Sequence, residues 1–79
     1  MRDPKPIERI RKTIFDLNQE EFGKLAGTTQ ASVSRWETGQ QEPSISEMER
    51  IRAAAVERGL PWDDRWFFEP VPPEVRVVA

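Results

Sequence analysis

Hydrophobic positions along residues 6–59 recur at helical spacing in four segments, which polar or glycine-containing breaks separate. In the first segment, Ile7, Ile10 and Ile14 follow the i, i+3, i+7 pattern of a helix with one buried face. Pro6 precedes this stripe and suits the first turn of a helix, where its missing N–H is not needed. The pattern therefore predicts a first helix that begins at Pro6.

A second helix is predicted to follow Asn18, whose side chain can cap the free N–H groups of a first turn. Phe22 and Leu25 lie at helical spacing, and Gly27 ends the helix because glycine tolerates the left-handed conformation. Gly23 lies inside the helix, where glycine costs roughly 0.5–1 kcal/mol relative to alanine. Either the turn to the next helix approaches closely there, or the position tolerates any small residue.

A third helix is predicted over residues 29–37, with Thr29 as its cap. Val33 and Trp36 are its only large apolar residues, so only a narrow stripe of this helix is buried. The small or polar residues around them largely face outward: Gln30, Ala31, Ser32, Ser34 and Arg35. Glutamine can form two hydrogen bonds with adenine, and arginine can do so with guanine, so this face is suited to reading base edges.

Ser44 and Glu47 have the spacing of a capping box, which predicts a fourth helix that begins directly after Ser44 and ends at Gly59. The polar loop 38–43 precedes it, and Gly39 marks the expected end of the third helix. The expected inward positions of the fourth helix are Ile45, Met48, Ile51 and Ala55, with Val56 as a further candidate.

Residues 61–68 hold two tryptophans, two phenylalanines and two aspartates placed for a first turn, which predicts a short fifth helix. Prolines at 70, 72 and 73 exclude a helix after it, and residues 74–78 have the composition of a short strand or extended tail.

The predicted fold class is all-α, with five short helices and this C-terminal tail. A chain of 79 residues allows one domain, which buries about 60% of the surface that the unfolded chain exposes. We divide it into a core, residues 1–59, and a C-terminal aromatic segment, residues 60–79. The predicted core positions are Ile7, Ile10, Ile14, Leu17, Phe22, Leu25, Val33, Trp36, Ile45, Met48 and Ile51.

The composition argues against several kinds of chemistry. The chain has no cysteine, which excludes disulfides and thiolate metal sites, and no histidine, the usual general base near neutral pH. No paired carboxylates or glycine-rich phosphate loop stand out, so we expect no enzyme activity, no metal site and no cofactor. No apolar run approaches the ~20 residues of a membrane span, so we expect a cytoplasmic protein that does not bind membranes.

The charge is unevenly spread along the chain. The net charge is −2, but residues 1–42 hold seven basic and seven acidic residues, while residues 43–79 hold five and seven. Because DNA binding needs a locally basic face and not a basic total, this balance allows a DNA partner.

Four segments of this sequence together resemble the phage repressor/Cro-like helix-turn-helix family, also called the xenobiotic-response-element family. They are residues 17–22 (LNQEEF), 27–30 (GTTQ), 33–39 (VSRWETG) and 43–45 (PSI). The resemblance covers residues 7–59. It implies a lambda-repressor-like domain that binds double-stranded DNA sequence-specifically, with the helix 29–37 in the major groove.

The resemblance also implies roles for individual residues. The expected base contacts are Gln30, Ala31, Ser32 and Arg35, and the expected contacts with the DNA backbone are Gln19, Thr29, Gln40 and Gln41. In relatives, a basic residue late in the first helix pairs with the glutamate that closes the recognition helix. That glutamate matches Glu37 here, and its partner is either Arg11 or Lys12. Residues 10–17 are one residue longer than the usual family spacing.

The C-terminal aromatic segment is predicted to supply the contacts that hold two copies of the chain together as a homodimer. One helix-turn-helix unit reads few base pairs, so two copies about one helical turn apart on a palindromic or pseudo-palindromic site would supply specificity. The residues assigned to the dimer interface are Trp62, Trp66, Phe67, Phe68, Val75 and Val77. One tryptophan is expected to complete the core of its own chain against the first or fourth helix.

The sequence thus favours a homodimeric repressor or autoregulator. The alternative is an antitoxin-like interaction protein, whose C-terminal segment binds a partner protein while DNA binding is secondary. A third interpretation is an adaptor that uses the same fold without binding DNA.

Overall fold

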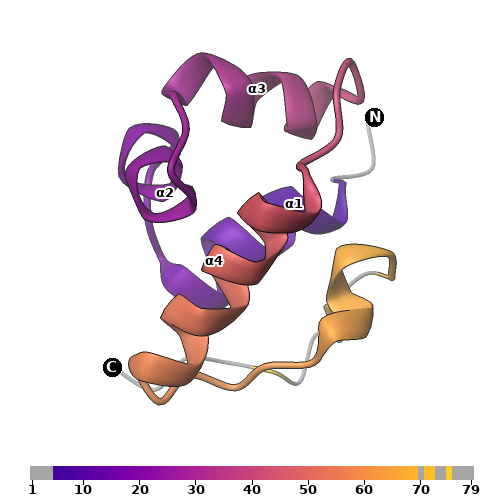
Figure 1. The fold of residues 1–79 in the computed structure, drawn as a ribbon. Helices are drawn as coiled ribbons and strands as arrows, with labels where there is room; N and C mark the ends of the chain where they lie inside the picture. The colour runs from indigo at the N-terminus through magenta and orange to yellow at the C-terminus, as the bar shows by residue number, and fades with distance from the viewer. Residues whose placement is uncertain (1–4, 70, 73–74, 76–79) are drawn as a thin grey trace.

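Short helices joined by turns make up most of the described part of the chain. The computed structural model describes residues 5–69, 71–72 and 75. In chain order they form α1 (Pro6–Arg9), the π-helical segment η1 (Ile10–Phe15), α2 (Gln19–Ala26), α3 (Gln30–Thr38), α4 (Ile45–Glu57) and the 3-10 turn η2 (Asp64–Phe67). The predicted helical architecture is confirmed in this part of the chain, with four α-helices in place of five (Figure 1). None of these helices is long and apolar enough to cross a membrane.

The predicted helix ends are built by the expected side chains. Asn18 accepts a hydrogen bond from the backbone N–H of Glu21 at 2.8 Å, and Glu21 accepts one from the backbone N–H of Asn18 at 3.1 Å. Ser44 and Glu47 form the same reciprocal pair at the start of α4. Gly27 follows α2 in the left-handed conformation, with φ of 77°. Local side-chain chemistry therefore fixes where α2 and α4 begin and where α2 ends.

The first predicted helix is divided, because α1 continues into the π-helical segment η1. The carbonyl oxygen of Arg11 accepts hydrogen bonds from the N–H groups of Asp16 and Leu17, the latter at 3.2 Å. A π-helical turn contains one residue more than an α-helical hydrogen-bonded turn, so η1 can accommodate the extra residue that the family resemblance predicts for the segment 10–17. Asp16 ends η1 in the left-handed conformation, with φ of 53°.

The core lies where the four α-helices and η1 meet. Its largest fully buried side chains are Phe22, Ile10, Ile14, Ile51 and Val33, and Ile7 and Trp36 are buried as predicted. Phe15 was not among the predicted core positions, yet it is buried and packs edge-on against Phe22, with ring centroids 5.6 Å apart. In a π-helix, residues five apart are hydrogen-bonded neighbours, so Phe15 shares the buried face of Ile10.

The predicted inward face of α4 is partly wrong. Ile45 is 70% exposed and Val56 is 66% exposed, while Ile51 and Ala55 are fully buried. At 100° per residue, Ile45 and Val56 lie about 120° and about 140° around the helix axis from Ile51, so one face cannot hold all of them. Leu17 and Leu25 are half-buried against the core, and Met48 is also half-buried.

The predicted fifth helix is a single 3-10 turn, η2. Asp63 caps it by accepting a hydrogen bond from the backbone N–H of Arg65 at 2.9 Å. Trp66 is buried in the core and η2 packs against α1, so the expectation that one tryptophan completes the core is confirmed. The predicted strand 74–78 lies outside the described residues except for Val75, which belongs to no strand.

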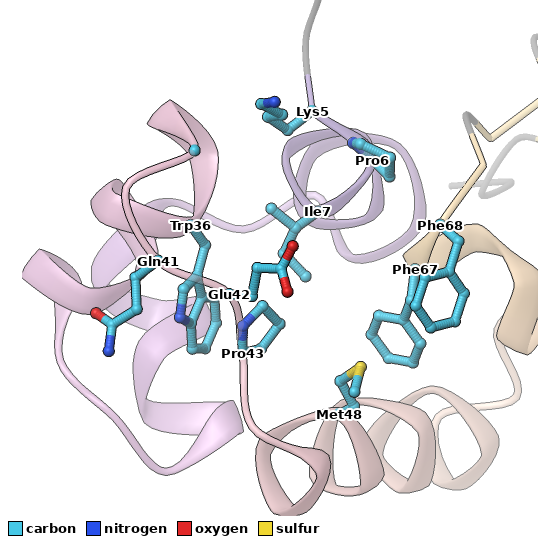
Figure 2. Close-up of a pocket in the computed structure, with 11 residues that line it drawn as sticks. Lys5, Pro6, Ile7, Trp36, Gln41, Glu42, Pro43, Met48, Phe67 and Phe68 are labelled. Atoms are coloured by element: carbon cyan, nitrogen blue, oxygen red, sulfur yellow. The ribbon is translucent and has the colours of Figure 1, made fainter.

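Two hollows flank Phe68, which is 77% exposed. The larger, of about 200 Å³, lies between the start of α1, the end of α3 with its following loop, α4 and η2 (Figure 2). The smaller, of about 180 Å³, lies between α4 and η2. We call the apolar side chains around them the α4–η2 surface, which consists of Ile45, Met48, Phe67 and Phe68.

Candidate nucleic-acid interface

The pair of helices α2 and α3 is joined by a tight turn that passes directly over Gly23. A Cβ atom on Gly23 would lie 3.0 Å from both the carbonyl carbon and the carbonyl oxygen of Thr29. The backbone N–H of Thr28 donates to the carbonyl oxygen of Gly23 at 2.8 Å. Close approach of the turn therefore explains Gly23, because backbone atoms cannot move aside for a side chain.

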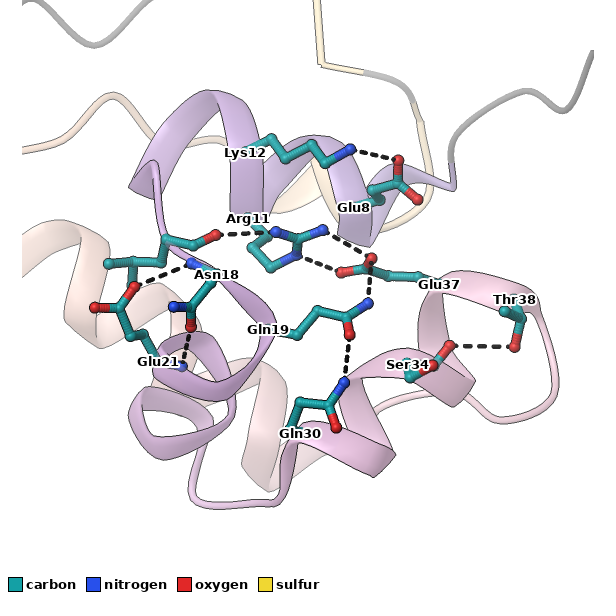
Figure 3. A network of polar contacts seen from close by, with 11 residues as sticks. Glu8, Arg11, Lys12, Asn18, Gln19, Glu21, Gln30, Ser34, Glu37 and Thr38 are labelled. Carbon is teal, nitrogen blue, oxygen red and sulfur yellow. Dashed lines mark hydrogen bonds and ion pairs between the residues drawn. The ribbon is translucent and has the colours of Figure 1, made fainter.

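A chain of four side chains runs from η1 to the start of α3 (Figure 3). Arg11 donates to Glu37 from Nε at 2.6 Å and from a terminal guanidinium nitrogen at 3.0 Å. Gln19 donates to the same carboxylate at 3.0 Å, and Gln30 donates to the amide oxygen of Gln19 at 2.6 Å. The partner of Glu37 is thus Arg11, while Lys12 pairs with Glu8 at 3.2 Å.

The Arg11–Glu37 ion pair is buried between η1 and α3. Arg11 is 9% exposed and Glu37 is 3% exposed. The hydrogen bonds with Glu37 raise the pKa of Arg11 above its ordinary value, so the guanidinium stays charged. Arg11 also donates to the carbonyl oxygen of Leu17 at 3.0 Å. The same guanidinium therefore joins η1, the entry to α2 and the last turn of α3.

The charge of Glu37 sets the direction of the hydrogen bonds that follow it. A carboxylate only accepts hydrogen bonds, so Gln19 presents its amide nitrogen to Glu37 and its amide oxygen to Gln30. Gln30 must then donate from its own amide nitrogen. Its amide oxygen has no partner among the described residues, and its second amide N–H remains on the exposed side of α3. The buried ion pair thereby orients an exposed amide.

The other predicted base contacts lie on α3 with different exposure. Ala31 and Arg35 are exposed, and Ser32 is half-buried. Thr29 caps the helix by accepting from the backbone N–H of Ser32 at 3.2 Å, and the two hydroxyl groups are also 3.2 Å apart. Thr29 and Ser32 therefore have local structural roles besides any contact with DNA.

Three of the four predicted backbone contacts lie at the two ends of α3. Thr29 is at its N-terminal end, and Gln40 and Gln41 follow its C-terminal end with exposed side chains. Gln19 begins α2 instead, and its side chain contacts both Gln30 and Glu37 of α3. The backbone N–H groups of Gln40 and Gln41 donate to the carbonyl oxygen of Arg35, at 2.9 Å and 3.3 Å. Only the side chains of these two residues remain to contact a phosphate.

The residues assigned to the dimer interface are placed differently from one another. Trp66 belongs to the core, whereas Trp62 is half-buried and packs edge-on against Trp66 and Phe67. Phe67 and Val75 are half-buried, Phe68 is exposed, and Val77 lies outside the described residues. Within residues 5–69, 71–72 and 75, no cluster of acidic side chains could hold a metal ion.

The comparison with protein families agrees with this geometry. A family model described as helix-turn-helix matches residues 7–54. The chain belongs to the Cro/C1-type helix-turn-helix family. This family consists of DNA-binding transcription regulators, so the match assigns DNA binding to the chain at the level of the class. No curated protein and no solved structure matches the chain.

Sequence reasoning missed the contact between Gln19 and Glu37, which gives Gln19 a structural role in addition to its predicted phosphate contact. A signal was available, since Gln19, Gln30 and Glu37 all lie at ends of the two helices of one helix-turn-helix unit. What the sequence lacked was the direction in which each long side chain extends.

Proposed function

We propose that the protein is a sequence-specific regulator that binds double-stranded DNA as a homodimer and acts as a repressor or autoregulator. In this proposal α3 lies in the major groove. The observation that carries it is the fixed amide of Gln30, because a base reader needs a defined donor and acceptor at the groove. Family membership supports DNA binding in general, and the oriented amide supports sequence specificity.

The groups that Gln30 retains match adenine. Its free amide oxygen can accept from N6 of adenine, and its second N–H can donate to N7. Guanine presents two acceptors at these positions, so the fixed amide oxygen would face an acceptor and lose a hydrogen bond. We therefore assign Gln30 to an A·T base pair.

The remaining contacts follow from the positions on α3. Ala31 and Ser32 would contact bases beside Gln30, and Arg35 would contact a guanine or a nearby phosphate. Gln19, Thr29, Gln40 and Gln41 would hold the DNA backbone at the two ends of α3, which positions the helix but does not select a sequence.

The homodimer would form through the α4–η2 surface together with Trp62 and Val75. The support is the exposure of Ile45 and Phe68, since large apolar side chains gathered on one face mark an association site. Trp66 would not contact the second copy, because it is buried in its own chain. It would contribute only by packing η2 against the core. Val77 remains a predicted interface residue.

The test is selection of duplexes from a random pool with the full chain. We expect a two-fold symmetric site whose half-sites are about one helical turn, 34–36 Å, apart. Binding of Gln30→Ala to the selected duplex and to single-base variants then identifies the position that Gln30 reads. If no sequence is enriched, the regulator proposal is wrong and the adaptor interpretation gains support.

A partner protein is the competing occupant of the α4–η2 surface, as in the antitoxin-like alternative. Gel filtration of the tagged chain from its own cells separates the two. A homodimer without other proteins supports the regulator, whereas a stoichiometric second protein supports the alternative.

A further inference from the structure

Three basic side chains of the helices that precede α3 are neutralised by carboxylates. Arg11 pairs with Glu37, Lys12 with Glu8 at 3.2 Å, and Lys24 with Glu20 at 3.6 Å. These three side chains are therefore less available to the phosphates of DNA. Around α3, Lys5 and Arg35 have no carboxylate partner in the described part of the chain, and neither has Arg50, whose guanidinium lies beside Gly27 in the turn before α3.

Lys5 lies against the C-terminal end of α3, although it is far from α3 in the sequence. A Cβ atom on Gly39 would lie 3.2 Å from Cε and 3.4 Å from Nζ of Lys5. Gly39 caps α3 with φ of 82°, and Gln40 and Gln41 follow directly. The missing side chain of Gly39 thus lets the Lys5 ammonium lie beside the loop that contains both glutamines (Figure 2).

We propose that Lys5 binds a DNA backbone phosphate and forms one phosphate-binding surface with the side chains of Gln40 and Gln41. The two glutamine side chains are exposed, long and neutral, and Lys5 supplies a positive charge directly beside their loop. Arg35 is then free to contact a base. This inference rests on the proposed function, since it extends the same DNA interface.

A purely structural role for Lys5 is the competing explanation. A cation at the C-terminal end of a helix interacts favourably with the helix dipole, so Lys5 could simply stabilise α3. The two roles differ in what they change. A phosphate contact changes the salt dependence of DNA binding, whereas a helix-end contact changes only the unfolding of the protein.

The experiment compares Lys5→Gln with Lys24→Gln in the full chain. Both variants remove one positive charge, but Lys24 is paired with Glu20 on the exposed side of α2. Each neutralised phosphate contributes about −0.9 to the slope of log affinity against log salt. For a dimer, Lys5→Gln should make the slope shallower by about 2, and near 0.1 M salt should lower affinity roughly eightfold per half-site.

The loss of affinity in Lys5→Gln should be equal on the selected duplex and on random duplex, because phosphate contacts carry no sequence information. Lys24→Gln should leave the slope unchanged, and Lys5→Arg should restore it. Equal slopes for Lys5→Gln and Lys24→Gln would overturn the assignment, as would a lowered melting temperature of Lys5→Gln with unchanged DNA binding. If the wild-type chain shows no sequence preference but still binds DNA more tightly than Lys5→Gln, the proposed function is contradicted. The assignment of Lys5 to a phosphate is then retained.

Discussion

At the scale of single residues, we assign the reading of DNA first to Gln30, whose direction is fixed by Gln19. Gln30→Ala should cost about 1–3 kcal/mol on the best site and much less on random DNA, because base contacts specify and phosphate contacts position. Gln19→Ala should also weaken discrimination at the Gln30 position, since it removes the acceptor that orients the Gln30 amide. Titration of selected and random duplexes measures both. Equal losses on the two duplexes for Gln30→Ala would rule out its role as a base reader.

Glu37 should matter for folding more than any exposed carboxylate. Glu37→Gln leaves the Arg11 guanidinium buried without its ionic partner, and breaking a buried pair in this way costs about 3–5 kcal/mol. Urea unfolding followed by tryptophan fluorescence measures the loss. Glu20→Gln is the matched control, because its ion pair with Lys24 is exposed and such pairs contribute about 0–1 kcal/mol. Similar losses for the two variants would show that the buried pair has no special role.

The residues of this network were predicted, but their pairing was not. The sequence identified Glu37 as a structural partner and left Arg11 and Lys12 as alternatives. The choice depends on where residues 11 and 12 lie around the first helix, and a π-helical segment changes that angle in a way that regular periodicity does not include. Once η1 is known, Arg11 faces α3 and Lys12 faces Glu8.

At the scale of elements, the turn between α2 and α3 constrains Gly23. Helix propensity alone predicts that Gly23→Ala stabilises the protein, by about 0.5–1 kcal/mol. The added Cβ would meet backbone atoms of Thr29 at 3.0 Å, and overpacking of this kind costs about 1–3 kcal/mol. We therefore expect a net loss of roughly 1–2 kcal/mol by chemical denaturation. A gain in stability would mean that the turn can move away from α2.

Substitutions of Asp16 test how strongly the backbone conformation at the end of η1 affects stability. Its φ of 53° is unfavourable for most residues, and β-branched residues are the least suited to it. Asp16→Val should destabilise the protein by about 1–2 kcal/mol, whereas Asp16→Gly, which also removes the carboxylate, should lose less or gain. The comparison separates the backbone conformation from the lost charge. A larger loss for Asp16→Gly would point to a contact of the carboxylate itself.

The ends of the helices could be predicted from the sequence, because capping hydrogen bonds join residues that are close in the chain. The face that each helix turns toward the core could not be predicted. Asn18, Ser44 and Gly27 set their helix boundaries through hydrogen bonds within a few residues. The outward rotation of Ile45 depends instead on which face of α4 meets the rest of the core. The same holds for η2, where aromatic composition indicated burial of one tryptophan but could not show which.

At the scale of the whole molecule, the larger hollow lies between the proposed DNA-contacting loop and the proposed association surface. The larger hollow is lined by the loop after α3, through Gln41, and also by Phe68 of the α4–η2 surface. A second copy seated on the α4–η2 surface would lie near the C-terminal end of α3. The spacing of two recognition helices would then be set by the same contacts that hold the dimer, as binding to two half-sites requires.

The association surface can be tested without disturbing the core. Truncation of the C-terminal segment would remove buried Trp66, so single exposed side chains are the better targets. Phe68→Ser should shift the sedimentation of the chain from dimer to monomer, with a change in folding stability of about 0.5 kcal/mol or less, because its ring is 77% exposed. Val56→Ser is the control, since Val56 is 66% exposed on the same helix as Ile45 but lines neither hollow. If Phe68→Ser and Val56→Ser both sediment as dimers, the two copies associate through another face, and the α4–η2 surface is left for a different protein.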